Sequence, residues 1–187
     1  MPLEQDMINI LRNHATRQIA FSFTSSTGGP VEVNQTSFRR VIHGLQHNQF
    51  EVTTVGAPPG GAAYNKNSSI AGRSGRFKVN PAGGPHVAFE SLVVHESVHA
   101  SFDLTSSVFP FVDNEVAAHI AQGWYYHLKN ITPAMINWEP VKQGTIIGAS
   151  LAGGHGIPAA SLTALRTALL AATPYQSYIH TTFSGNG

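Results

Sequence analysis

The chain has 187 residues, a length that fits one domain with a sizeable core. Its 11 Lys and Arg nearly balance its 10 Asp and Glu, and the formal net charge of +1 argues against nucleic acid as the main partner, because phosphate binding needs a basic patch. The chain has no cysteine, which excludes a disulfide scaffold, a thiolate nucleophile and a Cys-bound zinc.

The N-terminal residues predict no targeting segment. Residues 1–6 carry two acidic side chains and no apolar core of signal-peptide length. We also expect no transmembrane helix, because no run of about 18 apolar residues occurs. The localisation stays open between the cytoplasm and export by a non-classical route.

The first third of the chain predicts helices that alternate with strands. Residues 3–13 have the apolar spacing of a helix, and residues 19–23 alternate like a strand that ends in the turn 28–30. Thr36 and Ser37 fit the N-cap of a second helix. Residues 50–55 are β-branched and alternating, which predicts a strand.

Residues 56–84 are rich in Gly and Pro and form the least regular segment. Residues 69–71 and 76–79 within it predict short strands. The segment fits either a substrate-facing strand or mobile lip, or a plain connection, and both interpretations stay open.

The middle of the chain predicts two helices. Pro85 followed by the apolar run Val87–Phe102 indicates a helix of about 17 residues, and residues 103–111 form the connection. Asp113 and Asn114 fit the cap of a second helix that extends to Leu128.

The last third predicts further helices around a Gly-rich stretch. A short helix fits residues 132–138, and Pro158 begins a last helix that ends near Ala171. Residues 144–156 are Gly-rich and apolar, and their glycines leave room beside His155 for a ligand or for another backbone. We expect the tail from Thr181 to be frayed.

The sequence His95-Glu96-x-x-His99 lies in the middle of the first predicted long helix. His95 and His99 are one turn apart on the same face, so both imidazoles can reach a single metal ion. Glu96 lies about 100° round the helix and can meet a water on that metal. Two core histidines with a solvated acid are disfavoured in so apolar a helix, because buried polar groups are costly without partners.

A catalytic zinc site has three protein ligands and keeps a fourth position for water. Four downstream residues are candidates for the third ligand: Asp103, Asp113, Glu115 and His119. Glu115 is favoured, because it lies in the first turn of a helix that can return antiparallel to the first.

The other three candidates have alternative roles. His119 lies one turn beyond Glu115 and fits either a ligand or a hydrogen-bond donor to a tetrahedral intermediate. Asp103 follows His99 by one turn and fits a carboxylate that orients this imidazole. Asp113 is more simply the cap of the second helix.

Together with the downstream Asn114-Glu115-x-x-Ala118, the motif resembles the gluzincin metallopeptidases, in particular the compact, minimal ones. The resemblance covers residues 70–128. It implies that His95, His99 and Glu115 bind Zn²⁺ and that Glu96 is the general base that activates water to cleave a peptide bond. The chain departs from the larger gluzincins, which carry an Asp where His119 stands.

The donor that stabilises the transition state, often a Tyr or His in such families, stays unassigned. Its candidates are Tyr64, His119, Tyr125, Tyr126, His127, His155 and Tyr178.

We therefore expect one α+β, zincin-like domain over residues 1–187. Residues 1–84 would supply helices and a small, partly antiparallel sheet, residues 85–129 two metal-bearing helices, and residues 130–187 further helices and the tail. The expected function is a zinc metallopeptidase that acts on peptides or proteins, without nucleic-acid or membrane partners. Two alternatives remain: a metal-binding sensor or interaction module without turnover, and a secreted toxin or effector with peptidase activity.

Overall fold

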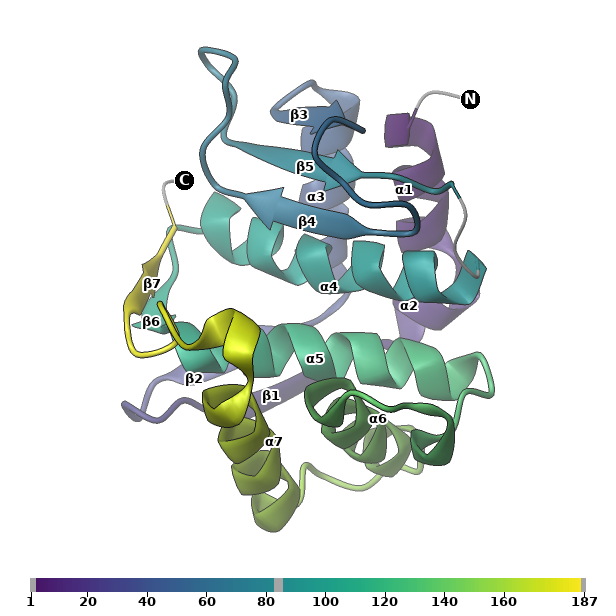
Figure 1. Ribbon diagram of the computed structural model, residues 1–187, viewed down its shortest axis with the longest axis vertical. Coiled ribbons are helices and arrows are strands. Elements are labelled where there is room, and N and C mark those ends of the chain that lie inside the picture. The colour runs from purple at the N-terminus through teal and green to yellow at the C-terminus, as the bar shows by residue number, and fades with distance from the viewer. Residues whose placement is uncertain (1–2, 83–85, 186–187) are drawn as a thin grey trace.

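Two long helices cross the middle of the molecule and run antiparallel to each other (Figure 1). They are α4 (His86–Leu104) and α5 (Phe111–Leu128), seen in a computed structural model that describes residues 3–82 and 86–185. Both helices are apolar on nearly every face, the pattern of a helix that is buried on all sides. The two predicted central helices are thus confirmed, although Pro85 lies outside the described residues.

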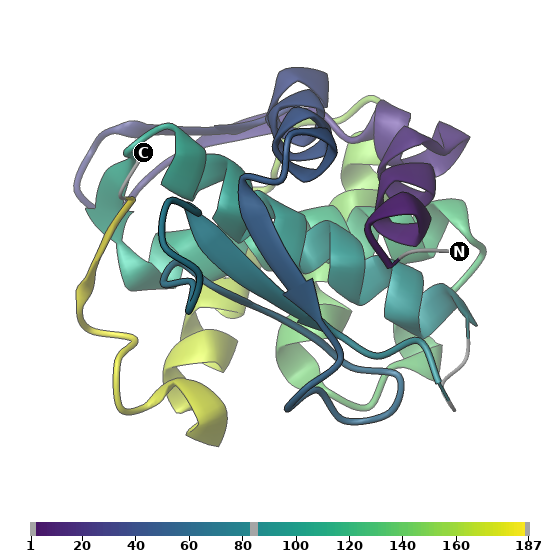
Figure 2. The ribbon, with the colours of Figure 1, turned by 90° about the horizontal axis from the view of Figure 1, so that it is seen from above.

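Three helices form the N-terminal part of the chain, of which the first and third pack on α4 and the second packs against its neighbours and α5 (Figures 1 and 2). They are α1 (Leu3–Arg12), α2 (His14–Gln18) and α3 (Gln35–Gln46). The cap of α3 is Asn34 rather than the expected Thr36 and Ser37. The Asn34 side chain accepts hydrogen bonds from the backbone N–H groups of Thr36 (2.8 Å) and Ser37 (3.3 Å), and the Ser37 hydroxyl accepts one from the backbone of Asn34 (3.2 Å), which completes a capping box.

A three-stranded sheet packs on the face of α4 opposite α5. Its strands β3 (Phe50–Thr53), β5 (Gly75–Val79) and β4 (Ala62–Asn65) lie in this order, with β3 parallel and β4 antiparallel to β5. The strands at 50–55 and 76–79 are confirmed, whereas residues 69–71 form turns. Strand β4 was not predicted, because Ala and Asn are poor strand formers.

A separate hairpin of β1 (Phe21–Thr24) and β2 (Pro30–Val33) lies beside α5. One sheet was expected in the N-terminal part of the chain. The structure has two sheets there, and each packs on a different central helix. The combination of helices with small sheets confirms the α+β class. Within the described ranges, no helix has the length and apolar character needed to cross a membrane.

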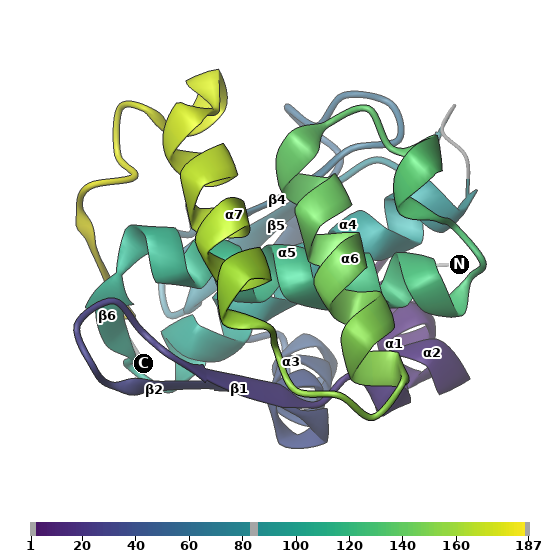
Figure 3. The ribbon, with the colours of Figure 1, turned by 90° about the horizontal axis from the view of Figure 1, so that it is seen from below.

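The C-terminal third covers the remaining side of α5 (Figure 3). After the 3₁₀ turn η1 (Pro133–Met135) come α6 (Glu139–Ala152) and α7 (Ala159–Ala171). Most of the Gly-rich stretch 144–156 belongs to α6, because its glycines let two backbones meet. A Cβ atom on Gly144 would collide with the backbone of His119 on α5.

The final described segment is folded, contrary to the expected frayed tail. After the 3₁₀ turn η2 (Thr173–Tyr175), β7 (Thr182–Ser184) pairs antiparallel with β6 (Val108–Pro110), which precedes α5. Phe183 stacks on Phe109, with ring centroids 5.7 Å apart. One continuous cluster of buried apolar side chains extends from α1 to β7.

Candidate metal centre

Two buried imidazoles of α4 face each other at the centre of the molecule. His95 and His99 are 5% and 8% exposed, and their Nε2 atoms lie 3.1 Å apart. The helical spacing of four residues brings both rings to the face of α4 that meets α5.

Side-chain amides of α5 determine which ring nitrogens carry protons. The Nδ1 atom of His99 lies 2.9 Å from Oδ1 of Asn114, and Nδ1 of His95 lies 3.2 Å from Oε1 of Gln122. Because an amide oxygen only accepts, each Nδ1 is the protonated donor and each Nε2 presents a lone pair. Two lone pairs 3.1 Å apart repel each other, and a cation held between them removes that repulsion.

Glu115 of α5 completes a triangle with the two imidazoles. Its Oε2 lies 3.6 Å from Nε2 of His95, and its Oε1 lies 3.6 Å from Nε2 of His99. Ligand atoms about 2.1 Å from a tetrahedral zinc are roughly 3.4 Å apart, so the triangle has the size of a zinc site. The Oε2 atom is also buried and has no hydrogen-bond partner among the described residues.

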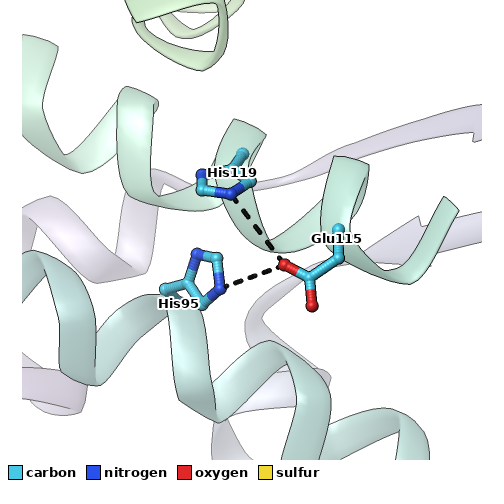
Figure 4. Close-up of side chains that lie close together, drawn as sticks. All are labelled: His95, Glu115 and His119. Carbon is cyan, nitrogen blue, oxygen red and sulfur yellow. Dashed lines mark ion pairs between the residues drawn. The ribbon is translucent and has the colours of Figure 1, made fainter. Parts of the chain in front are cut away.

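His119 approaches the same carboxylate oxygen as His95 (Figure 4). Its Nε2 is 3.9 Å from Oε2 of Glu115, and ligand atoms of His95, Glu115 and His119 all lie within 4.8 Å of one another. The hydroxyl of Tyr175, from η2, is 3.0 Å from the same Nε2. Burial and the nearby His95 lower the pKa of His119 well below its usual 6.5, which keeps this ring neutral.

The two glutamates of the centre have opposite proton affinities. Burial alone would raise the pKa of Glu115, but its electrostatic interactions with the imidazoles of His99, His95 and His119 outweigh burial and hold that pKa at about 2. Burial raises the pKa of Glu96 to about 7, although His99 acts in the opposite direction. Glu115 is thus a permanent anion, whereas Glu96 can take up and release a proton near neutral pH.

A cleft of about 570 Å³ leads to these side chains. Edge strand β4 forms one wall and the segment from η2 to β7 forms the other. The backbone N–H of Tyr64 in β4 donates a 2.7 Å hydrogen bond to Oε2 of Glu96. The lining residues are Ala63, Tyr64, Asn65, Lys66, His95, Glu96, His99, Phe111, Asn114, Glu115, Tyr175, Tyr178, Thr181, Thr182, Phe183 and Ser184.

Asp103 does not have the orienting role expected for it. The buried carboxylate accepts a 2.5 Å hydrogen bond from the hydroxyl of Tyr64, while Nδ1 of His99 faces Asn114. Asp103 therefore holds the edge strand to α4, at a position two turns beyond Glu96.

Asp113 is neither the helix cap nor a ligand. Helix α5 begins at Phe111, two residues earlier. The Asp113 carboxylate accepts bonds from the backbone and hydroxyl of Ser26 (2.8 and 2.7 Å) and from Nε and Nη2 of Arg166 (3.0 and 2.7 Å). It joins the β1–β2 turn to α7 and is not part of the triangle formed by His95, His99 and Glu115.

The candidate donors to the transition state differ in whether they line the cleft. Tyr64 and Tyr178 line the cleft, whereas Tyr125, Tyr126, His127 and the exposed His155 are not among its lining residues. The sequence analysis missed Tyr175, because this residue lies 56 positions beyond its partner His119 and in a segment without periodicity. Only the closure of the fold brings it to the centre.

The centre thus consists of five side chains of α4 and α5, with Tyr175 added from η2. Comparisons with models of known protein families, with curated proteins and with solved structures give no match for this chain.

Proposed function

We propose that the chain is a zinc-dependent hydrolase with a zincin-like fold, and that peptides or proteins are its substrates. The proposal rests mainly on the Nε2 atoms of His95 and His99, which lie 3.1 Å apart and are each 3.6 Å from an oxygen of Glu115. Two imidazoles and a carboxylate are a ligand set that suits catalytic zinc. The preference for peptide bonds rests on the resemblance to gluzincins and on the cleft along an edge strand, a shape that suits an extended peptide.

A zinc ion held by His95, His99 and Glu115 would supply a Lewis acid that acidifies a water and polarises a substrate carbonyl. Glu96 accepts the proton of that water on its carboxylate and transfers it to the leaving amine. The Tyr64 N–H fixes Oε2 of Glu96 at 2.7 Å, which leaves Oε1 for the proton. The Tyr175 hydroxyl lines the same cleft and can donate to the oxygen that becomes negative.

Elemental analysis of protein purified without an affinity tag tests the metal assignment. We expect one zinc per chain in the wild type and in Glu96→Gln, and loss of zinc in His95→Ala and Glu115→Gln. His43→Ala is the matched control, because this histidine is exposed on α3. A wild type that takes up no zinc from zinc-containing buffer would overturn the proposal.

Peptide hydrolysis tests the reaction. The wild type should cleave members of a mixed peptide library, and Glu96→Gln should lose at least about 100-fold in rate while it keeps its zinc. Equal rates in both proteins would remove Glu96 from the role of general base.

His119 supports a second candidate, a metal-binding module without turnover. If its Nε2, 3.9 Å from Glu115, became a fourth ligand, it would fill the position that a catalytic zinc keeps for water. In that case His119→Ala should lose zinc affinity as strongly as Glu115→Gln, and the wild type should cleave no peptide. A role as a secreted effector stays a prediction from the sequence.

A further inference from the structure

A second cavity lies among the N-terminal helices α1, α2 and α3. Its volume is about 560 Å³, close to that of the cleft. Helices α1, α2 and α3 form its walls, and the proposed metal chemistry uses none of its residues.

Three guanidinium groups surround this cavity. Arg12, Arg17 and Arg39 come from three different helices, and all three are exposed. His43 adds a fourth basic side chain, and no carboxylate is among the described residues that line the cavity. None of the three arginines forms an ion pair within the described part of the chain.

The positive character of this region is not visible in the net charge. Four of the chain's ten carboxylates are buried, on Glu90, Asp103, Asp113 and Glu115. The surface is therefore more basic than the formal charge of +1 indicates. The sequence analysis expected no basic patch, because a net charge does not distinguish buried from exposed groups.

The floor of the cavity is apolar. Leu11 and Phe38 lie beneath the arginines, with Ile42 beside them. A neighbouring cavity of about 460 Å³ shares Arg39 and His43 and continues past Arg40. The two cavities form a basic groove around α3 that is longer than a small ion requires.

We propose that this basic groove binds an acidic segment of a partner polypeptide. Guanidinium groups pair with carboxylates in a two-pronged geometry, and an apolar side chain between the carboxylates would rest on the floor. A nucleic-acid backbone suits the groove less well, because it needs a basic stripe and makes no use of an apolar floor. The proposal does not depend on the metal centre, so either can fail without the other.

Fluorescence anisotropy with a labelled peptide of glutamates and interspersed leucines tests this site. We compare the wild type with Arg12→Gln/Arg17→Gln and with Lys78→Gln/Lys142→Gln, which loses the same charge elsewhere. Neither arginine side chain has a hydrogen-bond partner among the described residues, so the fold should survive, and circular dichroism checks this. We expect the first variant to weaken binding at least tenfold and the second less than about twofold.

Three results would overturn the proposal. The first is no binding to the wild type at low salt, and the second is equal weakening in the two variants, which indicates a general charge effect. The third is a single-stranded oligonucleotide that binds at least tenfold more tightly than the peptide and depends on the same two arginines, which would make nucleic acid the partner. Weaker binding of a peptide with serine in place of leucine would support the role of the apolar floor.

Discussion

At the scale of single residues, two amides determine the chemistry of the centre. Asn114 and Gln122 accept from the Nδ1 atoms of His99 and His95, and this leaves both Nε2 lone pairs for a cation. Partners of this kind fix the tautomer and orientation of a ligating imidazole and raise its affinity for metal.

Asn114→Ala should therefore weaken zinc binding by about 10- to 100-fold, because His99 loses the acceptor that fixes its tautomer. Competition with a chromogenic chelator measures the affinity. Asn9→Ala is the matched control, since Asn9 is exposed on α1 and should leave the affinity unchanged. Unchanged affinity in Asn114→Ala would show that the tautomer is fixed by another group.

Whether the contacts of a residue could be predicted depends on how far along the chain its partner lies. His95, Glu96 and His99 could be placed on one helix from their spacing, and Glu115 from the short connection that follows. Asp103 and Asp113 were given local roles, but their partners Tyr64, Ser26 and Arg166 lie 39 to 87 positions away. Sequence spacing predicts contacts within a helix and carries no information on such distant pairs.

At the scale of elements, glycines set the distance between α5 and α6. Cβ atoms on Gly123 and Gly148 would collide with the backbone of the opposite helix, as one on Gly144 would with His119. Close packing of the two backbones places the His119 carbonyl directly against α6.

Gly144→Ala should destabilise the fold by about 1–3 kcal/mol, because the added methyl meets backbone that cannot move aside. Gly156→Ala is the control, since a Cβ there meets no atom within 4 Å. Urea unfolding gives both values. Equal stability of the two variants would contradict the tight contact between α5 and α6.

The Asp113–Arg166 ion pair joins three elements: the β1–β2 turn, the first turn of α5 and α7. Asp113 is fully buried, so its charge depends on the bonds from Arg166 and Ser26. Removing one partner of a buried pair leaves an uncompensated charge, which costs more than the pair itself contributes.

Arg166→Met should cost about 3 kcal/mol of the free energy of unfolding. Lys142→Met removes an exposed ion pair with Glu139 and should cost less than about 1 kcal/mol. Thermal and urea unfolding both report the difference. A small effect in Arg166→Met would mean that water reaches Asp113.

Helices α1 and α3 could be predicted from their apolar periodicity, and α4, α5 and α7 from apolar runs that follow a proline or a cap residue. Helix α6 was not predicted, because five of the thirteen residues 144–156 are glycines, and glycine is a poor helix former. Strands β2, β4, β6 and β7 were missed, because each is short and gains its structure from pairing with another strand.

At the scale of the whole molecule, the core contains a group of polar side chains that a cation would stabilise. His95, His99, Glu115 and His119 are all buried, and they come from α4 and α5, which run side by side. A ligand that binds only the folded state stabilises that state by mass action.

Zinc should therefore raise the melting temperature. Free zinc at about 1,000 times its Kd adds about 4 kcal/mol, which corresponds to roughly 10 °C for a chain of this size. Differential scanning calorimetry with zinc, and again after a chelator, measures the shift. Glu115→Gln should show little of it, and an equal shift in this variant would place the bound zinc elsewhere.

The parts of the cleft are synthesised at different times. The proposed ligands lie in the middle of the chain, whereas Tyr175, Tyr178 and β7 form a wall that is synthesised later. For the hydrolase proposed above, the cleft that would receive the substrate is therefore complete only after translation has passed Ser184.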